Sequence, residues 1–184
     1  LGYLAYDSKT KTARIPNEEI RMEFSRAIRT TRKDETIRRL LESDKLIEDI
    51  IHMDEDAVAV QIEKIHAEES PLHYNSEQSL RSTIKRALFS AYDNFTLFEE
   101  FPGGTGYADV VYLPKQDAEL PILMIELKWD MSADTALNQI RSRNYPAPFQ
   151  SYGSDILLVG INYDKNAKPG ERHHTCKIEK ISRP

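Results

Sequence analysis

Glu126 and Lys128 are the two residues of this sequence whose types and spacing most directly suggest chemistry. They follow an apolar run at 122–125, which predicts a central strand that is covered on both faces. Because side chains alternate along a strand, the carboxylate and the ammonium point to the same face. Burying both charges is costly unless they pair or bind an ion. The pair alone therefore fits either a structural ion pair or a reactive site.

Asp109 adds a second carboxylate. It lies early in a predicted strand at 107–113, which follows a glycine-rich turn at 103–106. If this strand pairs antiparallel with the one at 121–128, Asp109 lies opposite the end that carries Glu126. Two converging carboxylates are suited to hold a hard divalent cation through oxygen ligands.

Glu77 is a third acid, on the helix that precedes these strands. It comes three residues before Leu80 and seven before Ile84, so it shares the apolar face that turns toward the sheet. The alternative interpretation is that Glu77 is a first-turn acid favoured by the helix dipole.

These side chains can be positioned by an α/β arrangement in the last part of the chain. One helix is predicted from Asn75 or Ser76 to Asn94, and another from about 132 to 144. Their order along the chain is αβββαβ with a terminal strand, which predicts an α/β fold with a mixed sheet. The strand-like runs lie at 95–101, 107–113, 121–128, 155–163 and 174–181.

The sequence divides into three predicted parts. Residues 1–31 read as a short hairpin followed by a helix. Residues 32–72 contain no glycine and are predicted to be a helical connector, with Asp54 capping its second helix. Residues 73–184 form the α/β domain.

The composition, 40% hydrophobic and 30% charged, is that of a globular chain without a membrane segment. The single cysteine, Cys176, excludes an internal disulfide, is expected in the core and fits a reducing, cytoplasmic compartment. The net charge of −5 argues against strong non-specific nucleic-acid binding by the whole surface. The first residue is not methionine, so we expect a fragment of a longer protein.

The residues taken together resemble the PD-(D/E)XK nuclease superfamily. The shared features are an acid on the first helix, a glycine-rich turn before Asp109, the Glu126-x-Lys128 strand and a glutamine, Gln139, on the next helix. The resemblance implies a restriction-endonuclease-like core and a metal-dependent hydrolase that acts on nucleic acid. It is closest to a branch that is fused behind AAA-type ATPase domains, and residues 1–28 are similar to the tail of such a region. An ATPase domain in the same full-length chain is therefore an expected partner.

The resemblance also implies a ligand set for a metal ion. Asp109, Glu126, the backbone carbonyl of Leu127 and Glu77 are expected to bind Mg²⁺, with Mn²⁺ as a substitute. Nucleic acid is the expected substrate. DNA is expected at the level of the family, and RNA stays open.

Four further side chains are given roles on the same basis. Lys128 is expected to orient the attacking water or to stabilise charge on the phosphate. Gln139 is expected to support the water or a phosphate from the helix. Arg141 and Arg143 are expected to contact the nucleic-acid backbone. Tyr145 is given no role, because its spacing from Gln139 is wider than in some branches of the family.

Two alternatives stay open at the level of sequence. A nuclease-like fold that has lost activity could serve as an interaction or regulatory module of its ATPase. The other alternative is an acidic helical scaffold with an incidental ion pair, which does not explain the presence of Asp109.

His52 and His66 are expected to be exposed or simply packed. A metal site shared by His173 and His174 is not expected, because neighbouring side chains on a strand face opposite ways.

Overall fold

The computed structural model describes most of the chain from residue 35 onward. It forms two compact units, residues 1–41 and residues 42–184, and each is described here by itself. The residues that it describes are 5–7, 12–14, 19, 21–22, 35–68, 76–115, 119–149, 152, 154–168 and 170–182.

The first unit contains the predicted hairpin. Strands β1 (Ala5–Asp7) and β2 (Thr12–Arg14) pair antiparallel. The described residues between 19 and 22 are helical, and the rest of the helix predicted after the hairpin lies outside the described residues. Helix α2 (Glu35–Ile51) begins in this unit.

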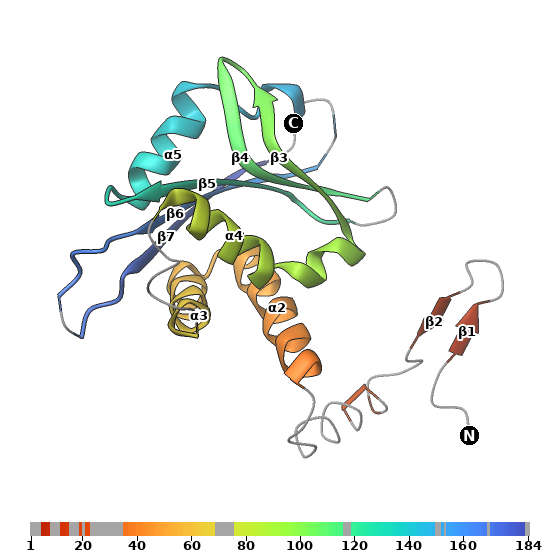
Figure 1. Cartoon of the computed structure of the whole chain (residues 1–184). Helices are drawn as coiled ribbons and strands as arrows, with labels where there is room; N and C mark the ends of the chain where they lie inside the picture. Colours follow the sequence, from red (N-terminus) through yellow and green to blue (C-terminus); the bar gives the residue numbers. More distant parts are fainter. Residues whose placement is uncertain are drawn as a thin grey trace. The chain divides into compact units, whose positions relative to one another are not determined.

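The second unit is built on one five-stranded sheet with the order β3-β4-β5-β6-β7 (Figure 1). The pairs β3–β4, β4–β5 and β6–β7 are antiparallel, whereas β5 and β6 run parallel. This mixed sheet confirms the predicted α/β fold, and each strand lies within two residues of its predicted bounds. The strands are β3 (Phe95–Gly103), β4 (Gly106–Pro114), β5 (Ile122–Trp129), β6 (Ile156–Tyr163) and β7 (His174–Ile181).

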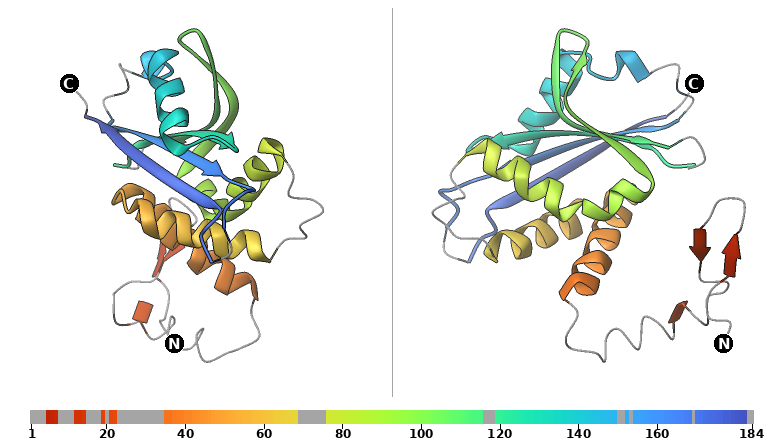
Figure 2. Two further views of the ribbon diagram at one scale, coloured as in Figure 1. Left: turned by 90° about the vertical axis from the view of Figure 1, so that its left-hand side faces the viewer. Right: turned by 45° about the vertical axis from the view of Figure 1, so that its right-hand side comes forward.

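Helices cover both faces of this sheet. Helices α3 (Glu55–Ala67) and α4 (Glu77–Ala87) lie on one face, and α5 (Ala133–Ser142) lies on the other (Figures 1 and 2). Ser76 is the N-cap of α4, which agrees with one of the two starts predicted for this helix, Asn75 or Ser76. The helix is shorter than predicted, because the chain continues as a 3₁₀ helix, η1 (Phe89–Asp93).

Strand β5 is central, as its apolar run predicts. Leu123, Ile125 and Leu127 join the core under α3 and α4, whereas Ile122 and Met124 join the core under α5. All five side chains are buried. This alternation assigns the even-numbered positions of β5, including those of the two charged residues, to the face that α5 covers.

Helix α5 lies very close to β6, and Gly160 permits this approach. A Cβ at Gly160 would lie 2.4 Å from the carbonyl oxygen of Ala133 and 3.0 Å from the Cβ of Ala136. No larger residue fits without moving the helix. The position of α5, and of every side chain it projects toward β5, is therefore set by backbone contact.

The predicted connector contributes to the core of the second unit. Leu46 and Ile50 of α2 and Val58 and Ile62 of α3 are buried in the cluster that covers the sheet. Asp54 caps α3 by accepting a hydrogen bond from the amide of Ala57, as predicted. The division of the sequence at residues 31 and 72 stays a prediction. Within the described part of the chain, no helix combines the length and the apolar character needed to cross a membrane.

Candidate active site

The site lies where strands β4 and β5 end their pairing. The register pairs Val110 with Ile125, so Asp109 and Glu126 are the next residues outward on the two strands. The predicted antiparallel pairing is thus confirmed. Beyond this point a side chain replaces the backbone ladder, because Oδ2 of Asp109 accepts the amide hydrogen of Leu127 at 2.8 Å. That bond fixes Asp109 at the end of β5.

Arg81 holds the other oxygen of Asp109. Its guanidinium donates to Oδ1 of Asp109 and, at 3.1 Å, to the exposed carboxylate of Glu100. The Asp109 carboxylate is almost fully buried. Sequence reasoning missed Arg81, although it follows Glu77 by four residues and therefore lies on the same face of α4.

Glu126 is the most deeply buried acid of the site. Its Oε1 accepts hydrogen bonds from Nζ of Lys128 at 2.9 Å and from the amide of Gln139. Its Oε2 is buried without a hydrogen-bond partner among the described residues. Burial, reinforced by the negative charge of Asp109, raises the pKa of Glu126 to about 7. One oxygen of this carboxylate therefore lacks the compensation that a buried charge needs.

Lys128 links two of the predicted metal ligands. Its Nζ donates to Oε1 of Glu126 and, at 2.8 Å, to the carbonyl oxygen of Leu127. The ammonium is itself buried. It therefore occupies the space between the carboxylate and the carbonyl that the sequence predicted to bind a cation.

Gln139 and Tyr145 form a second layer around Glu126. The side-chain amide of Gln139 donates to Glu126 and also, at 3.0 Å, to the hydroxyl of the buried Tyr145. Tyr145 packs against Gly103 and Gly106 of the β3–β4 hairpin, where added Cβ atoms would lie 2.6 and 3.1 Å from it. Tyr145 therefore positions Gln139, a contact that the sequence spacing did not reveal.

Glu77 lies near the site but outside its hydrogen bonds. Its side chain is half-buried at the start of α4, and burial raises its pKa. The charge of Lys128 opposes this rise and that of Asp109 adds to it, so both lie within electrostatic reach. The carboxylates of Glu77, Asp109 and Glu126 do not gather within 4.8 Å as one group.

Arg141 and Arg143 have contacts away from these carboxylates. Arg141 forms an ion pair with Glu179 of β7 and donates to Asn138. Arg143 donates to the carbonyl of Thr105 in the β3–β4 turn at 3.2 Å. Their predicted contact with nucleic acid stays a prediction.

The donor set fits a divalent cation. Asp109 and Glu126 come from paired strands, and the partnerless Oε2 of Glu126 is an oxygen that a hard cation would compensate. Arg81 forms an ion pair with Asp109, and Lys128 forms one with Glu126. The two buried carboxylates thus already depend on positive charge for their stabilisation, which a bound cation would also supply. Such a cluster can bind a cation together with a phosphate group that Lys128 and Arg81 attract.

The five-stranded mixed sheet, with α4 and α5 on opposite faces and acids at the β4–β5 junction, defines a restriction-endonuclease-like fold. The family model of the PD-(D/E)XK nuclease superfamily matches residues 75–170, more than half of the 184 residues. The chain belongs to this superfamily. No curated protein matches the sequence. Membership implies a nuclease, a hydrolase that uses divalent metal ions and acts on nucleic acid.

Proposed function

We propose that the protein hydrolyses phosphodiester bonds of DNA with Mg²⁺ held at Asp109 and Glu126, and that Mn²⁺ can substitute. The observation that carries this proposal is the buried Oε2 of Glu126, which has no hydrogen-bond partner among the described residues. If Glu126 formed only a structural ion pair, this buried oxygen would stay without a hydrogen bond, which destabilises the folded protein by about 1–3 kcal/mol. A cation between Glu126 and Asp109 removes the cost.

Asp109 and Glu126 are the proposed ligands from side chains, and the carbonyl of Leu127 is the third. The Asp109–Leu127 hydrogen bond supports this set, because it holds a carboxylate beside the peptide whose carbonyl would bind the ion. When bound, the cation supplies Lewis-acid activation of a phosphate oxygen and of water. Glu77 is a proposed outer ligand, reached through water from the start of α4.

Lys128 and Gln139 are the proposed polar groups that act on the reacting phosphate. Lys128 donates to Glu126 and to the carbonyl of Leu127 in the structure. A cation held there would displace it, and its ammonium would then be free to orient the water and to stabilise negative charge on the phosphate. Gln139 keeps its link to Tyr145 and so holds the Glu126 carboxylate in place. Arg141 and Arg143 are proposed to contact the backbone of the substrate.

The broader setting rests on the resemblance described above. We propose that this chain is the C-terminal part of a cytoplasmic protein whose preceding region is an AAA-type ATPase, because residues 1–28 are similar to the tail of such a region. The net charge of −5 favours binding through the cation and the basic groups beside it, Arg81 and Lys128, rather than through the whole surface.

The test is cleavage of plasmid and of single-stranded DNA by the purified chain, with Mg²⁺, with Mn²⁺ and with a chelator. Cleavage is expected only with a divalent ion. Lys128→Met removes the ammonium and keeps the length of the side chain, so it should lower kcat by about 10²- to 10³-fold, as loss of a transition-state donor does. Glu126→Gln should lower the affinity for Mg²⁺ as well.

Lys180→Met is the matched control, because Lys180 is an exposed lysine paired with Asp155 on the sheet. It should cleave like the wild type. Cleavage that survives Lys128→Met unchanged would remove Lys128 from the mechanism. A protein that binds DNA but cleaves neither DNA nor RNA would favour the regulatory interaction module.

A further inference from the structure

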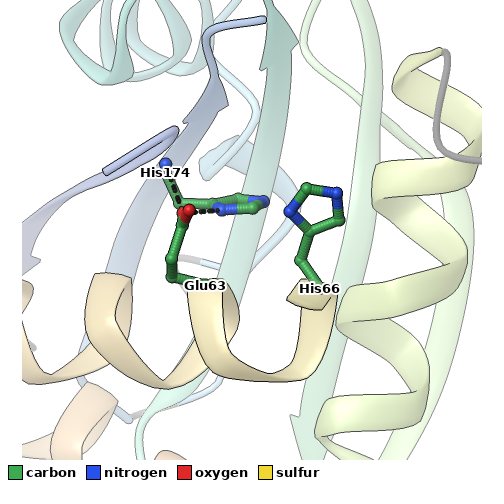
Figure 3. A group of neighbouring side chains, drawn as sticks. All are labelled: Glu63, His66 and His174. Carbon is green, nitrogen blue, oxygen red and sulfur yellow. Dashed lines mark hydrogen bonds and ion pairs between the residues drawn. The ribbon is translucent and has the colours of Figure 1, made fainter. Parts of the chain in front are cut away.

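A second cluster of potential ligands lies between α3 and the start of β7. Glu63 and His66 are three residues apart on α3 and therefore share one face of the helix. His174 is the first residue of β7, and Figure 3 shows its ring between the Glu63 carboxylate and the His66 ring. One ligand atom from each of the three residues lies within 4.8 Å of the others. No other such group of three occurs in the part of the chain that the structure describes.

Glu63 is fixed by β7. Its Oε2 accepts hydrogen bonds from the backbone amides of His173, at 3.1 Å, and of His174, at 3.0 Å. The same oxygen also forms a hydrogen bond of 2.6 Å with Nδ1 of the His174 ring. The carboxylate therefore has a single orientation. Farther along the same face of α3, Glu55 accepts from the amide of Ile178 and from Lys177. Two carboxylates thus hold the helix against the strand and leave the cluster little freedom.

The two imidazoles are arranged as a bound ion would require. The ring centroids of His66 and His174 are 5.1 Å apart, with the planes at 70°. Two imidazoles on one tetrahedral Zn²⁺, with Zn–N bonds of about 2.0–2.1 Å, have centroids about 5 Å apart. The His66 ring also contacts the Tyr163 ring at 5.2 Å and the His173 ring at 6.3 Å. These contacts confine His66 to this side of α3.

We propose that Glu63, His66 and His174 bind a divalent transition-metal cation of the Zn²⁺ type, each through one ligand atom, with water completing a tetrahedral set. The hydrogen bond between Glu63 and His174 holds two ligands together before the ion arrives. Binding through Nδ1 of His174 requires the neutral ring to carry its proton on Nε2, so that Nδ1 offers its lone pair to the ion. It also requires Nδ1 and Oε2 of Glu63 to separate from 2.6 Å to about 3.3 Å, the spacing that a tetrahedral zinc imposes. This displacement of less than one ångström is within the reach of side-chain rotation.

The chemistry of the ligands selects the ion. Imidazole nitrogen favours Zn²⁺ and related transition-metal ions such as Cu²⁺ and Ni²⁺, whereas the carboxylates of the nuclease site favour Mg²⁺. Burial keeps His174 in the neutral form that a metal ligand needs, because it lowers the pKa of this histidine to about 4. The Glu63 carboxylate is already ionised at neutral pH, since its hydrogen bonds with His174 outweigh its partial burial and lower its pKa.

The consequence is a metal clamp between α3 and the β6–β7 edge of the sheet. Tyr163, which pairs with His174 in the register, also packs against Trp129 at the end of β5, with the ring centroids 4.4 Å apart. The clamp thus adjoins the strand that carries Lys128 but shares no ligand with the nuclease site. It should therefore stabilise the fold and be separable from cleavage.

The test is the zinc content of the tag-free chain after treatment with a chelator and dialysis against Zn²⁺ in a large excess of Mg²⁺. The excess of Mg²⁺ occupies the oxygen ligands of the nuclease site. One Zn²⁺ per chain should be retained, and it should raise Tm. His66→Ala should weaken the binding at least tenfold and abolish the rise in Tm.

His52→Ala is the matched control, because His52 is an exposed histidine whose Nδ1 lies at hydrogen-bond distance, 2.8 Å, from the backbone carbonyl oxygen of Glu48. It should retain one Zn²⁺. A double variant, Asp109→Asn with Glu126→Gln, should also retain it, so the clamp can stand even if the nuclease proposal fails. The inference is overturned if wild type retains no Zn²⁺, if His66→Ala retains as much, or if the double variant loses it.

Discussion

The carboxylate of Glu126 has one oxygen crowded with donors and another without any among the described residues. This asymmetry makes its protonation state matter to the ion it is proposed to bind. With a pKa of about 7, Glu126 binds a proton below neutrality, and that proton competes with the cation.

The affinity for Mg²⁺ is therefore expected to rise with pH. Below about pH 7 each unit of acidification should weaken binding by up to about tenfold, because one proton must leave, and above about pH 8 the affinity should level off. Isothermal titration calorimetry at pH 6, 7 and 8 measures this. Glu126→Gln should bind weakly with no such dependence. A wild type whose affinity is constant from pH 6 to 8 would contradict the role of Glu126.

Arg81 provides a second prediction for a single residue. Its guanidinium occupies Oδ1 of Asp109, so it competes with a cation for that oxygen. Arg81→Gln should bind Mg²⁺ several-fold more tightly, because a nearby like charge is removed. The same variant should bind DNA more weakly, because a group that can hold phosphate is lost. Calorimetry with Mg²⁺ and DNA binding measured in Ca²⁺ separate the two effects, and a loss of Mg²⁺ affinity would refute the competition.

The residues found from sequence are those whose neighbours are set by local geometry. Strand alternation places Glu126 and Lys128 together, and antiparallel register adds Asp109. Arg81 and Tyr145 were not assigned, because their contacts depend on how α4 and the β3–β4 hairpin dock. His66 was expected to be exposed or simply packed, and His174 was considered only together with His173. The approach of His66 to His174 was not foreseen, since the two residues meet only when α3 packs against β7.

The β3–β4 hairpin packs against the end of α5, beside the Tyr145–Gln139 link. Its turn rests on the end of α5, because the amide of Thr105 donates to the carbonyl of Arg143 at 2.9 Å. Gly104 in this turn has φ of +52°, and a Cβ there would lie 1.8 Å from the same carbonyl oxygen. Both the conformation and the space demand glycine.

Gly104→Ala is expected to destabilise the protein and to loosen the Tyr145–Gln139 link. The left-handed conformation alone costs about 1–2 kcal/mol for alanine, and the clash adds to it. Gly170→Ala is the control, since Gly170 also has a positive φ of +89° but no atom within 4 Å of an added Cβ. Thermal unfolding should show a clearly larger loss of Tm for Gly104→Ala. Equal losses would mean that the hairpin is not docked on α5.

Strands were predicted from sequence more closely than the ends of helices. Each strand has an apolar run bounded by turn residues, so its limits are local. Helix α4 was predicted to reach Asn94, yet it gives way to η1 after Ala87. There the amide and hydroxyl of Ser90 both donate to the buried hydroxyl of Ser43 on α2. A contact across 47 residues cannot be seen in the periodicity of one helix.

The stability of the whole metal-free molecule should depend on pH through two buried groups with opposite signs. His174 has its pKa lowered to about 4, so the unfolded state takes up a proton first and stability falls as pH drops below about 6.5. Glu126 has its pKa raised to about 7, so the folded state takes up a proton first and stability rises as pH drops from about 7 to 4.5. The two effects offset each other.

The prediction is that Tm of the chelator-treated wild type changes little between pH 7 and pH 5. Glu126→Gln should lose stability steeply on acidification, by up to about 1.4 kcal/mol per pH unit, because the His174 effect is then no longer offset by that of Glu126. His174→Gln should gain stability over the same range. Denaturant unfolding at pH 5, 6 and 7 tests this, and parallel pH dependence in all three proteins would refute it.

The ties between α3 and β7 also bear on how the chain folds as it is synthesised. Glu63 and His174 are 111 residues apart, and β7 is the last of the described strands to be made. Until it emerges, the edge of β6 is open and the α3 carboxylates lack the amides that they accept from. At about 5–20 residues per second, the interval between the end of β6 and the end of β7 is about one to four seconds. The nascent sheet is therefore exposed to wrong pairing at the β6 edge during that delay.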